Sequence, residues 1–208
     1  LGLRPLDGGS LLLLGREANA WSTQQRLGAG MAYIPEDPVR QGAVPGMTVV
    51  ENMVLGDVKK YLRKIGLAID WPRAEKQCGE LLNTTFLTTP PGLHRYVETL
   101  SGGNMQRVVI AREVGRSPQI LLAYYPARGL DLANAEAMRQ LLLQERARGV
   151  GILLISEDLN ELFALSDRLL VMYHGRIVGN FAPHETDAYA VGHLMTGGEA
   201  RLPVSSEK

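Results

Sequence analysis

The chain has 208 residues, of which 45% are hydrophobic and 21% charged, a composition typical of one globular domain, alone or with a subdomain. Lysine plus arginine and aspartate plus glutamate number 22 each, which argues against a strongly basic nucleic-acid-binding protein. We expect no membrane-spanning helix, because no apolar run approaches ~20 residues. We expect no secretory signal peptide, because the start of the given sequence has no apolar core of the right length. The single cysteine, Cys78, excludes an internal disulfide and fits a reducing compartment.

Short strands and helices are predicted to alternate in the first part of the chain. Leu11–Leu14 predicts a short buried strand, Ser22–Leu27 a short helix, and Met31–Ile34 a second strand that ends before a proline. Residues 52–116 are predicted to be mostly helical. Helix breaks are expected at three places, Gly66, Trp71-Pro72 and Thr89-Pro90-Pro91-Gly92.

The second part of the chain continues this alternation. Its predicted elements are a central parallel strand at Gln119–Ala123, a helix at Leu132–Arg148, a buried strand at Gly151–Ile155, a short helix at Asp158–Leu165, a hairpin turning at His174-Gly175, and a last helix at Asp187–Met195. Strands that alternate with helices favour an α/β domain with a mainly parallel sheet.

The stretch Leu100–Gln106 predicts a helix start that faces an anion. Ser101 is a favoured N-cap residue, and Gly102 and Gly103 carry no side chain, so their backbone N–H groups stay accessible. Apolar residues then recur at helical spacing, at Met105, Val108, Val109 and Val114. Such a helix start attracts an anion by roughly 0.3–1 kcal/mol at an exposed site, and phosphate is the usual occupant. For an isolated Ser-Gly-Gly, an ordinary helix start is the alternative.

Residues Leu100–Gln106 resemble the signature motif of the ATP-binding-cassette (ABC) transporter ATPases, and the likeness runs from about Gly8 to Gly198. The resemblance implies an α/β, P-loop-NTPase-like fold, with a mainly parallel sheet and a helical subdomain at about 52–116. Residues 1–208 would be a partial nucleotide-binding domain with a C-terminal tail at about 197–208. No Gly-x-x-x-x-Gly-Lys-Ser/Thr pattern occurs and the first residue is leucine, so we expect a truncated domain without the phosphate-binding loop.

Two catalytic positions of this family are altered at the end of the predicted central strand. The family pattern is four apolar residues followed by Asp, Glu, Pro, Thr, any residue, Gly, Leu and Asp. Here Tyr124 stands in place of the metal-binding Asp, and Tyr125 in place of the general base. A tyrosine hydroxyl ordinarily has a pKa of about 10, so it is neutral at neutral pH. It offers no carboxylate to Mg²⁺, and the loss of a general base typically costs roughly 10²–10⁴-fold in rate.

Two more positions depart from the family at other predicted strand ends. Glu36 stands where most cassettes carry a glutamine that reaches the metal and the attacking water. Glu157 stands where the family has a histidine that orients the γ-phosphate, and a carboxylate would repel that phosphate. Ile-Pro-Glu-Asp at 34–37 and the stretch at 46–55 resemble the second, degenerate cassette of sugar and nucleoside importers.

In these ATPases two cassettes enclose ATP head to tail, each ATP lying between one cassette's phosphate loop and the other's signature. The resemblance therefore implies that Ser101, Gly102 and Gly103 contact ATP held by a partner cassette, while Asn104 and Gln106 support the helix start. The loop residues that match the family and line its dimer interface are Gly129, Leu130 and Asp131. No catalytic residue and no metal site are expected in this chain itself.

The implied cofactor is ATP, with Mg²⁺ only at the partner's site. The implied partners are another cassette, namely the N-terminal one of the same full-length protein, and membrane permease subunits. The chain would then be cytoplasmic and peripheral on the inner face of the cell membrane, without a nucleic-acid partner. The transported solute does not follow from these residues.

Two other functions remain open. The chain could be a working ATPase in which Glu36, Asp37 or Glu157 serves as the base, although Glu157 belongs to a different strand end. It could also be a non-transport cassette protein that acts on ribosomes or DNA. The neutral charge balance and the Ile-Pro-Glu-Asp variant disfavour that second possibility.

Overall fold

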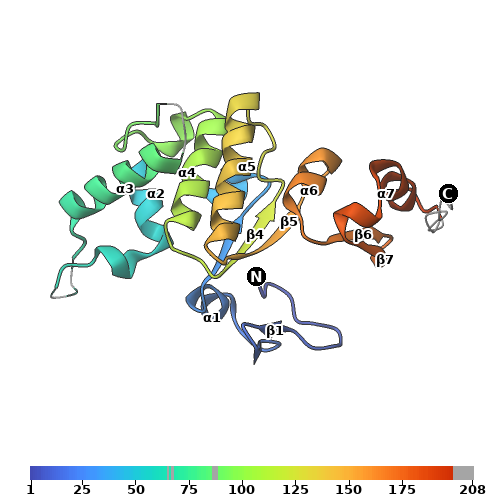
Figure 1. Ribbon diagram of the computed structural model, residues 1–208. Coiled ribbons are helices and arrows are strands. Elements are labelled where there is room, and N and C mark those ends of the chain that lie inside the picture. The colour runs from blue at the N-terminus through green and yellow to red at the C-terminus, as the bar shows by residue number, and fades with distance from the viewer. Residues whose placement is uncertain (65, 67, 86–88, 199–208) are drawn as a thin grey trace. The chain divides into compact units, whose positions relative to one another are not determined.

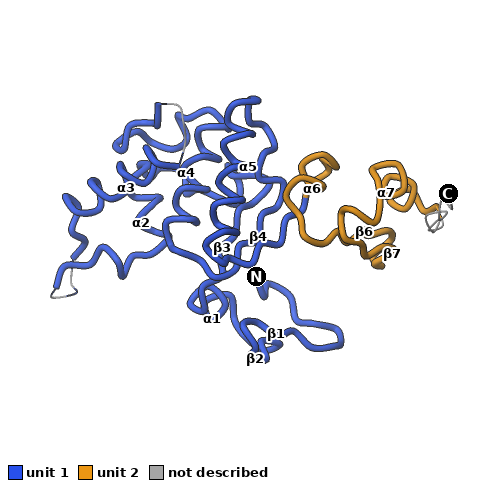
Figure 2. Tube along the Cα trace, viewed as in Figure 1, with its two compact units in different colours: residues 1–155 blue, residues 156–208 orange. Residues whose placement is uncertain are grey.

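The computed structural model describes residues 1–64, 66, 68–85 and 89–198. They form two compact units, residues 1–155 and residues 156–208, which are described here one at a time (Figure 2). Residues 199–208, which make up most of the tail expected at 197–208, lie outside the described residues. Within the described ranges, no helix is both long and apolar enough to cross a membrane.

The first unit opens with a small antiparallel hairpin, strands β1 (Leu12–Leu13) and β2 (Arg16–Glu17). The predicted strand at 11–14 is therefore present, but the prediction that it is buried was wrong. Leu12 is 65% exposed and Leu13 alone of the hairpin's strand residues is buried. Each strand of this hairpin pairs only with the other, so one side chain reaches the core while its neighbours point into solvent.

Helix α1 (Thr23–Gly28) confirms the short helix predicted at 22–27. Ser22 is its N-cap and forms a capping box with Gln25. The Ser22 hydroxyl accepts a hydrogen bond from the Gln25 backbone N–H at 3.3 Å, and the Gln25 side-chain oxygen accepts one from the Ser22 N–H at 2.8 Å.

A parallel three-stranded sheet forms the centre of the first unit, in the order β3-β4-β5 (Figure 1). Its strands are β3 (Met31–Ile34), β4 (Ile120–Tyr124) and β5 (Gly151–Ile155). Tyr33 is in register with Leu122, and Leu122 with Leu153. Parallel neighbours need long crossover connections, here the helical region before β4 and helix α5 (Leu132–Ala147) after it. The predicted parallel sheet is confirmed.

The two faces of this sheet are covered unequally. One face is buried, with Ile34 and Leu121 fully shielded, and helices α4 (Gly102–Val114) and α5 pack on the strands β3 and β5. On β5 alternate residues face the other side, where Leu153 is 53% and Ile155 44% exposed. The prediction that residues 151–155 form a buried strand is thus correct for the strand and wrong for its burial. The N-terminal segment covers β3 and β4 on that side, because Leu13 and Ala18 pack with Met31.

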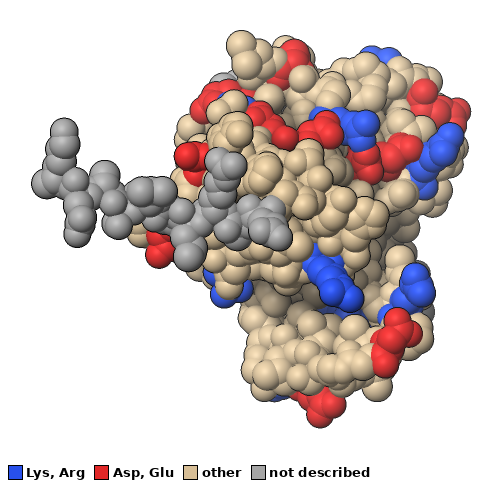
Figure 3. All heavy atoms as spheres, turned by 90° about the vertical axis from the view of Figure 1, so that its right-hand side faces the viewer, with Lys and Arg blue, Asp and Glu red and all other residues tan. Residues whose placement is uncertain are grey.

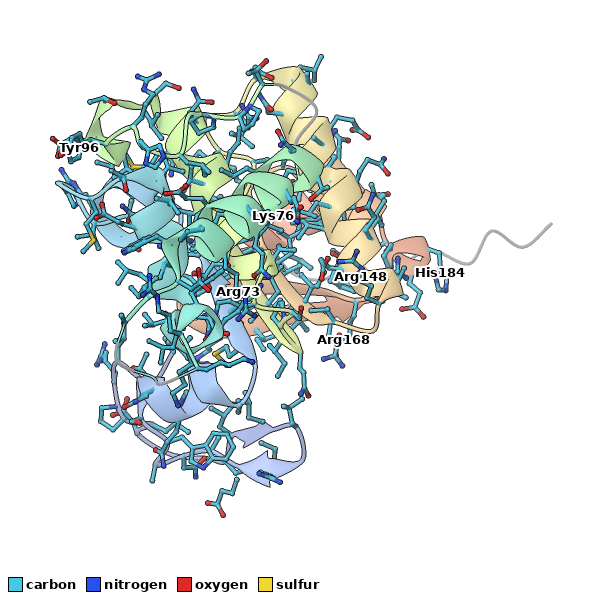
Figure 4. The ribbon with its side chains drawn as sticks, turned by 90° about the vertical axis from the view of Figure 1, so that its left-hand side faces the viewer. Arg73, Lys76, Tyr96, Arg148, Arg168 and His184 are labelled. Atoms are coloured by element: carbon cyan, nitrogen blue, oxygen red, sulfur yellow. The ribbon has the colours of Figure 1, made fainter. Side chains whose placement is uncertain are left out.

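The region between β3 and β4 is helical, as predicted. Trp71-Pro72, expected as a helix break, instead opens α3, because proline is tolerated in the first turn, where N–H groups lack partners within the helix. Arg73 and Lys76 lie on the exposed side of α3 (Figure 4). Ala74 and Cys78 lie on its buried side. The region holds, in chain order, η1 Pro38–Gly42, α2 Val49–Gly56, η2 Val58–Tyr61, α3 Trp71–Thr85, η3 Val97–Thr99 and α4.

The second unit is built on an antiparallel hairpin, as predicted. Its turn residues His174 and Gly175 both have positive φ, 45° and 76°, as a tight two-residue hairpin requires. Val171, Val191 and Leu194 form its small core. The elements of this unit are α6 Leu159–Leu165, β6 Leu169–Tyr173, β7 Arg176–Phe181, η4 Pro183–Glu185 and α7 Ala188–Met195.

Candidate functional site

Helix α4 begins as the sequence predicts. Ser101 is its N-cap, and the Ser101 hydroxyl accepts a hydrogen bond from the Asn104 backbone N–H at 3.4 Å. Ser101 and Gly102 are exposed, and a Cβ atom added to Gly102 would meet nothing within 4 Å. The backbone N–H groups of Gly102 and Gly103 have no hydrogen-bond partner in the described part of the chain. This helix start therefore presents accessible donors and the positive end of the helix dipole.

The loop between β4 and α5 lies directly beside this helix start. A Cβ atom on Gly103 would be 3.7 Å from the Gly129 carbonyl oxygen and 3.7 Å from Leu130 Cδ2. Asp131 anchors the end of this loop as the N-cap of α5. Its carboxylate accepts hydrogen bonds from Asn134, at 2.9 Å from the backbone N–H and 2.7 Å from the side-chain amide. The structure thus brings the predicted ATP-facing residues and the predicted interface loop together.

Gln106 ties α4 to the loops that follow two strands. Its side chain is buried, and its Nε2 donates to the backbone oxygens of Pro35, at 3.4 Å, and Pro126, at 3.3 Å. Asn104 makes a local contact instead, because its side-chain oxygen accepts a hydrogen bond from Arg107 Nη1 at 3.0 Å. Both side chains therefore hold parts of the chain in position rather than point outward from the helix start.

Two phenol rings, tilted by 57° relative to each other, lie at the carboxyl end of β4. Tyr124 is the last residue of the strand and Tyr125 follows it, with ring centroids 4.7 Å apart. Tyr125 has a φ of 48°, in the left-handed region that a non-glycine residue rarely adopts. The Tyr125 backbone N–H donates to the Ile155 oxygen at 2.8 Å. The backbone at this position is therefore strained and held by its surroundings.

The two carboxylates that follow β3 are both engaged. Glu36 forms an ion pair with Arg128, whose guanidinium also lies 5.7 Å from the centroid of the Tyr125 ring. Asp37 caps η1 by accepting hydrogen bonds from the backbone N–H groups of the next two non-proline residues, each at 3.0 Å, and pairs with Arg40 at 3.7 Å. The sequence predicted no partner for the Arg128 side chain, because Arg128 occupies the position of the family pattern that any residue can fill.

These strand ends do not fit the Mg²⁺ ion that the resemblance implies for a working ATPase. Mg²⁺ needs oxygen ligands, usually carboxylates, in a near-octahedral arrangement. Tyr124 and Tyr125 supply hydroxyls, and the Glu36 carboxylate is paired with a guanidinium. Among the described residues, no group of three or more His, Cys, Asp or Glu side chains could hold a metal ion. Glu157, the fourth altered position, is exposed at the start of the second unit.

A cavity of about 420 Å³ opens on the partly uncovered face of the central sheet. Tyr33, Tyr124, Leu153 and the N-terminal residues 1–4 contribute to its lining. Burial raises the pKa of Tyr33, and the neighbouring Tyr124 adds to that rise. The sequence analysis missed this cavity, although the period-two pattern of the strands places Tyr33 and Leu153 on one face.

The family model for the ABC transporter matches residues 1–126, more than half of the chain. This chain belongs to the ABC transporter family. Its match to the family model includes the altered strand end at Tyr124 and Tyr125 and stops at Pro126.

Named relatives of this cassette are import ATP-binding proteins. The glucose import ATP-binding protein TsgD13 of Haloferax volcanii is 33% identical over 95% of this chain and 36% of that protein. The guanosine import ATP-binding protein NupO of Bacillus subtilis is 33% identical over 94% of this chain and 38% of that protein. The ribose import ATP-binding protein RbsA 1 of Rubrobacter xylanophilus is 34% identical over 95% of this chain and 39% of that protein. The cassette thus spans less than two fifths of the length of these relatives.

A solved structure supports the fold. The dimeric post-hydrolysis state of the ATP-binding cassette MJ0796, bound to ADP and Pi, superimposes with a TM-score of 0.74. The match covers 87% of this chain and 76% of that chain at 22% sequence identity, so it bears on the fold alone. The expected ABC ATPase fold, with its parallel sheet and helices, is confirmed.

The cap at Asp131 predicts a specific pH dependence. The hydrogen bonds from Asn134, first from its backbone and then from its side chain, hold the pKa of Asp131 below its ordinary value of 3.8. Because the folded-state pKa is lowered, the charged cap stabilises the fold above that ordinary value, and this contribution is lost as the pH falls through the lowered value. We expect the Asp131→Asn variant to lose less stability than the wild type between about pH 5 and about pH 2.

The measurement is the urea midpoint of each protein across that range, followed by tryptophan fluorescence. Asparagine is also a favoured N-cap residue, so the variant keeps a cap that does not titrate. Parallel pH profiles for the two proteins would contradict the prediction.

Proposed function

We propose that this chain is the non-hydrolysing cassette of a sugar or nucleoside importer ATPase. In this role it donates the start of α4 to ATP that is bound by a partner cassette. One observation carries the proposal: the α4 start lies against the Gly129–Asp131 loop with accessible donors, while phenols stand at the end of β4. The names of the relatives, which import glucose, guanosine and ribose, support the importer class.

The chemistry of this role needs donors and no base. The Ser101 hydroxyl and the N–H groups of Gly102 and Gly103 would donate to the terminal phosphate of the partner's ATP. The positive end of the helix dipole favours the charge that develops on that phosphate. Bound ATP supplies the phosphoanhydride bond that the partner's own residues would cleave. Asn104 and Gln106 position the helix start through their contacts with Arg107 and the loops at Pro35 and Pro126.

The remaining parts of the proposal follow from this role. Mg²⁺ would bind only at the partner's site, since the residues at this chain's strand ends do not fit it. The partner would be the N-terminal cassette of the same full-length protein, and permease subunits would hold both at the cytoplasmic face of the membrane. Residues 52–116 would be the helical subdomain. On the face that Figure 3 presents, acidic and basic residues are interspersed without a broad basic patch, which agrees with the absence of a nucleic-acid partner from the proposal.

The second candidate, a working ATPase with another carboxylate as base, has less support. A general base must lie within hydrogen-bond reach of the attacking water and be able to take its proton. The Glu36 carboxylate pairs with Arg128. The Asp37 carboxylate caps η1 and pairs with Arg40. Both carboxylates would have to leave these partners before either could act.

The test compares the chain alone with the chain beside a second cassette that has a complete phosphate-binding loop. Alone with Mg-ATP, the full chain is expected to release phosphate at the background rate. Mixed with that cassette after its general base has been changed to glutamine, so that it binds ATP without hydrolysing it, the chain should form an ATP-dependent complex on size exclusion. Turnover by the chain alone that disappears in the Tyr125→Phe variant would contradict the proposal. So would the absence of an ATP-dependent complex.

A further inference from the structure

The altered positions at the ends of β3 and β4 form one connected cluster. Arg128 pairs with Glu36 across the two strand ends, and the same guanidinium lies over the ring of Tyr125 at 5.7 Å from its centroid. Tyr125 in turn packs on Tyr124. Arg128 thus contacts both Glu36 and Tyr125, although Glu36 comes from a separate loop.

We propose that Arg128 is a positioning residue whose guanidinium supplies the positive charge at this site. It holds the loop 126–131 against the start of α4 without a divalent metal ion. The inference rests on the proposed function, because that function gives this loop and the helix start their shared role. It deepens that function by explaining how the donor surface is formed in the chain by itself.

Arginine is chemically suited to this position. Its guanidinium is permanently charged and planar, so it can pair with a carboxylate and lie over an aromatic ring at the same time. Tyr125 supplies the ring, and Glu36 supplies the carboxylate. The family's carboxylate at the position of Tyr125 would offer Arg128 no aromatic ring. The family's neutral amide at the position of Glu36 would offer it no counter-charge. The departures at 36 and 125 are therefore complementary to the arginine at the variable position 128.

The position of Arg128 in its loop lets this cluster act on the helix start. The Arg128 backbone N–H donates to the Tyr125 oxygen at 3.1 Å, and the Leu130 N–H donates to the Ala127 oxygen at 3.2 Å. These two turns lead to Gly129. Its carbonyl oxygen lies 3.7 Å from the place that a Cβ atom added to Gly103 would occupy. Gln106 holds the loop at Pro126. Arg128 holds it from the solvent side.

The test is amide hydrogen exchange of the full chain in EDTA, followed at Leu130. Its N–H is hydrogen-bonded within the loop, and its intrinsic exchange rate is unaffected by the side chain at 128. An exposed ion pair together with a cation–π contact is expected to slow opening of the loop roughly tenfold. The Arg128→Ala variant should therefore exchange at Leu130 roughly tenfold faster than the wild type.

Matched variants separate this role from a general effect of losing an arginine. Arg40→Ala removes a more exposed arginine that pairs with Asp37, at 3.7 Å, and should leave exchange at Leu130 unchanged. Arg128→Lys should recover part of the protection, because lysine keeps the charge but loses the planar contact. Glu36→Gln combined with Arg128→Ala should add little to Arg128→Ala alone. Unchanged exchange in the strands β3 and β4 verifies that each variant is folded.

Two results would overturn the inference. One is equal exchange at Leu130 in the wild type and in Arg128→Ala. The other is wild-type protection at Leu130 that rises about tenfold when millimolar MgCl₂ replaces EDTA, because the loop would then depend on an external cation. Neither result involves ATP or a partner cassette, so each leaves the proposed donor role standing. Failure of the ATP-dependent complex, with the exchange results as expected, would remove the donor role and leave the cluster in place.

Discussion

Replacing Gly102 with leucine is expected to weaken ATP-dependent pairing with an intact cassette by about 100-fold or more, because the leucine side chain would keep a phosphoryl oxygen from reaching the preorganised backbone N–H donors. The structure gives no reason within the chain for glycine at this position, because a Cβ atom there would meet nothing within 4 Å. The fold should therefore accept the change, and leucine has the higher helix propensity. Any large loss must come from a molecule that approaches the start of α4 from outside.

The control is the same substitution at Gly192 in α7, where an added Cβ also meets nothing within 4 Å. Both variants should have wild-type urea midpoints, and only Gly102→Leu should lose the complex, measured as a dissociation constant by analytical ultracentrifugation. Wild-type pairing by Gly102→Leu would show that the helix start is not the surface that meets the partner's phosphate.

Replacing Leu121 with alanine is expected to destabilise the first unit by about 2–5 kcal/mol. Leu121 is 0% exposed on β4, the middle strand of the sheet, so the lost methyl groups leave a cavity between the sheet and its helices. A domain is typically stable by about 5–15 kcal/mol, so this loss is a large share of the total.

The measurement is urea unfolding followed by tryptophan fluorescence. Both tryptophans, Trp21 and Trp71, lie in the first unit, so the signal reports on that unit alone. Leu132→Ala removes the same atoms from a side chain that is 84% exposed and should change stability by less than about 0.5 kcal/mol. A loss below about 1 kcal/mol in Leu121→Ala would mean that the packing around β4 adjusts to the cavity.

Local signals in the sequence were sufficient for most of the elements. Ser101 and the spacing of the apolar residues after it predicted α4, and the turn at His174-Gly175 predicted the last hairpin. These features depend on residues near one another in the chain, where capping, glycine geometry and helical periodicity operate. The parallel direction of the strands followed from the alternation of strands and helices, and the central place of Gln119–Ala123 from its apolar run.

Burial could not be predicted in the same way. Gly151–Ile155 and Leu11–Leu14 are apolar runs, and an apolar run is compatible with a strand covered on both faces or on one. Which face is covered depends on segments far away in the chain. The same limit applies to the site: the helix start was predicted, but the ion pair of Arg128 with Glu36 joins two loops that only the folded chain brings together.

The third strand of the central sheet has a consequence for handling the protein. Within that sheet β5 pairs with β4 on one side only, so the N–H and C=O groups of its outer edge are not satisfied by a neighbouring strand of the sheet. Leu153 and Ile155 stand exposed along the same strand. An edge strand with unpaired backbone groups and exposed apolar side chains can pair with the same strand of another copy of the protein. At high concentration the chain is therefore expected to self-associate through the edge strand β5. Leu153→Lys is the substitution best suited to prevent this association.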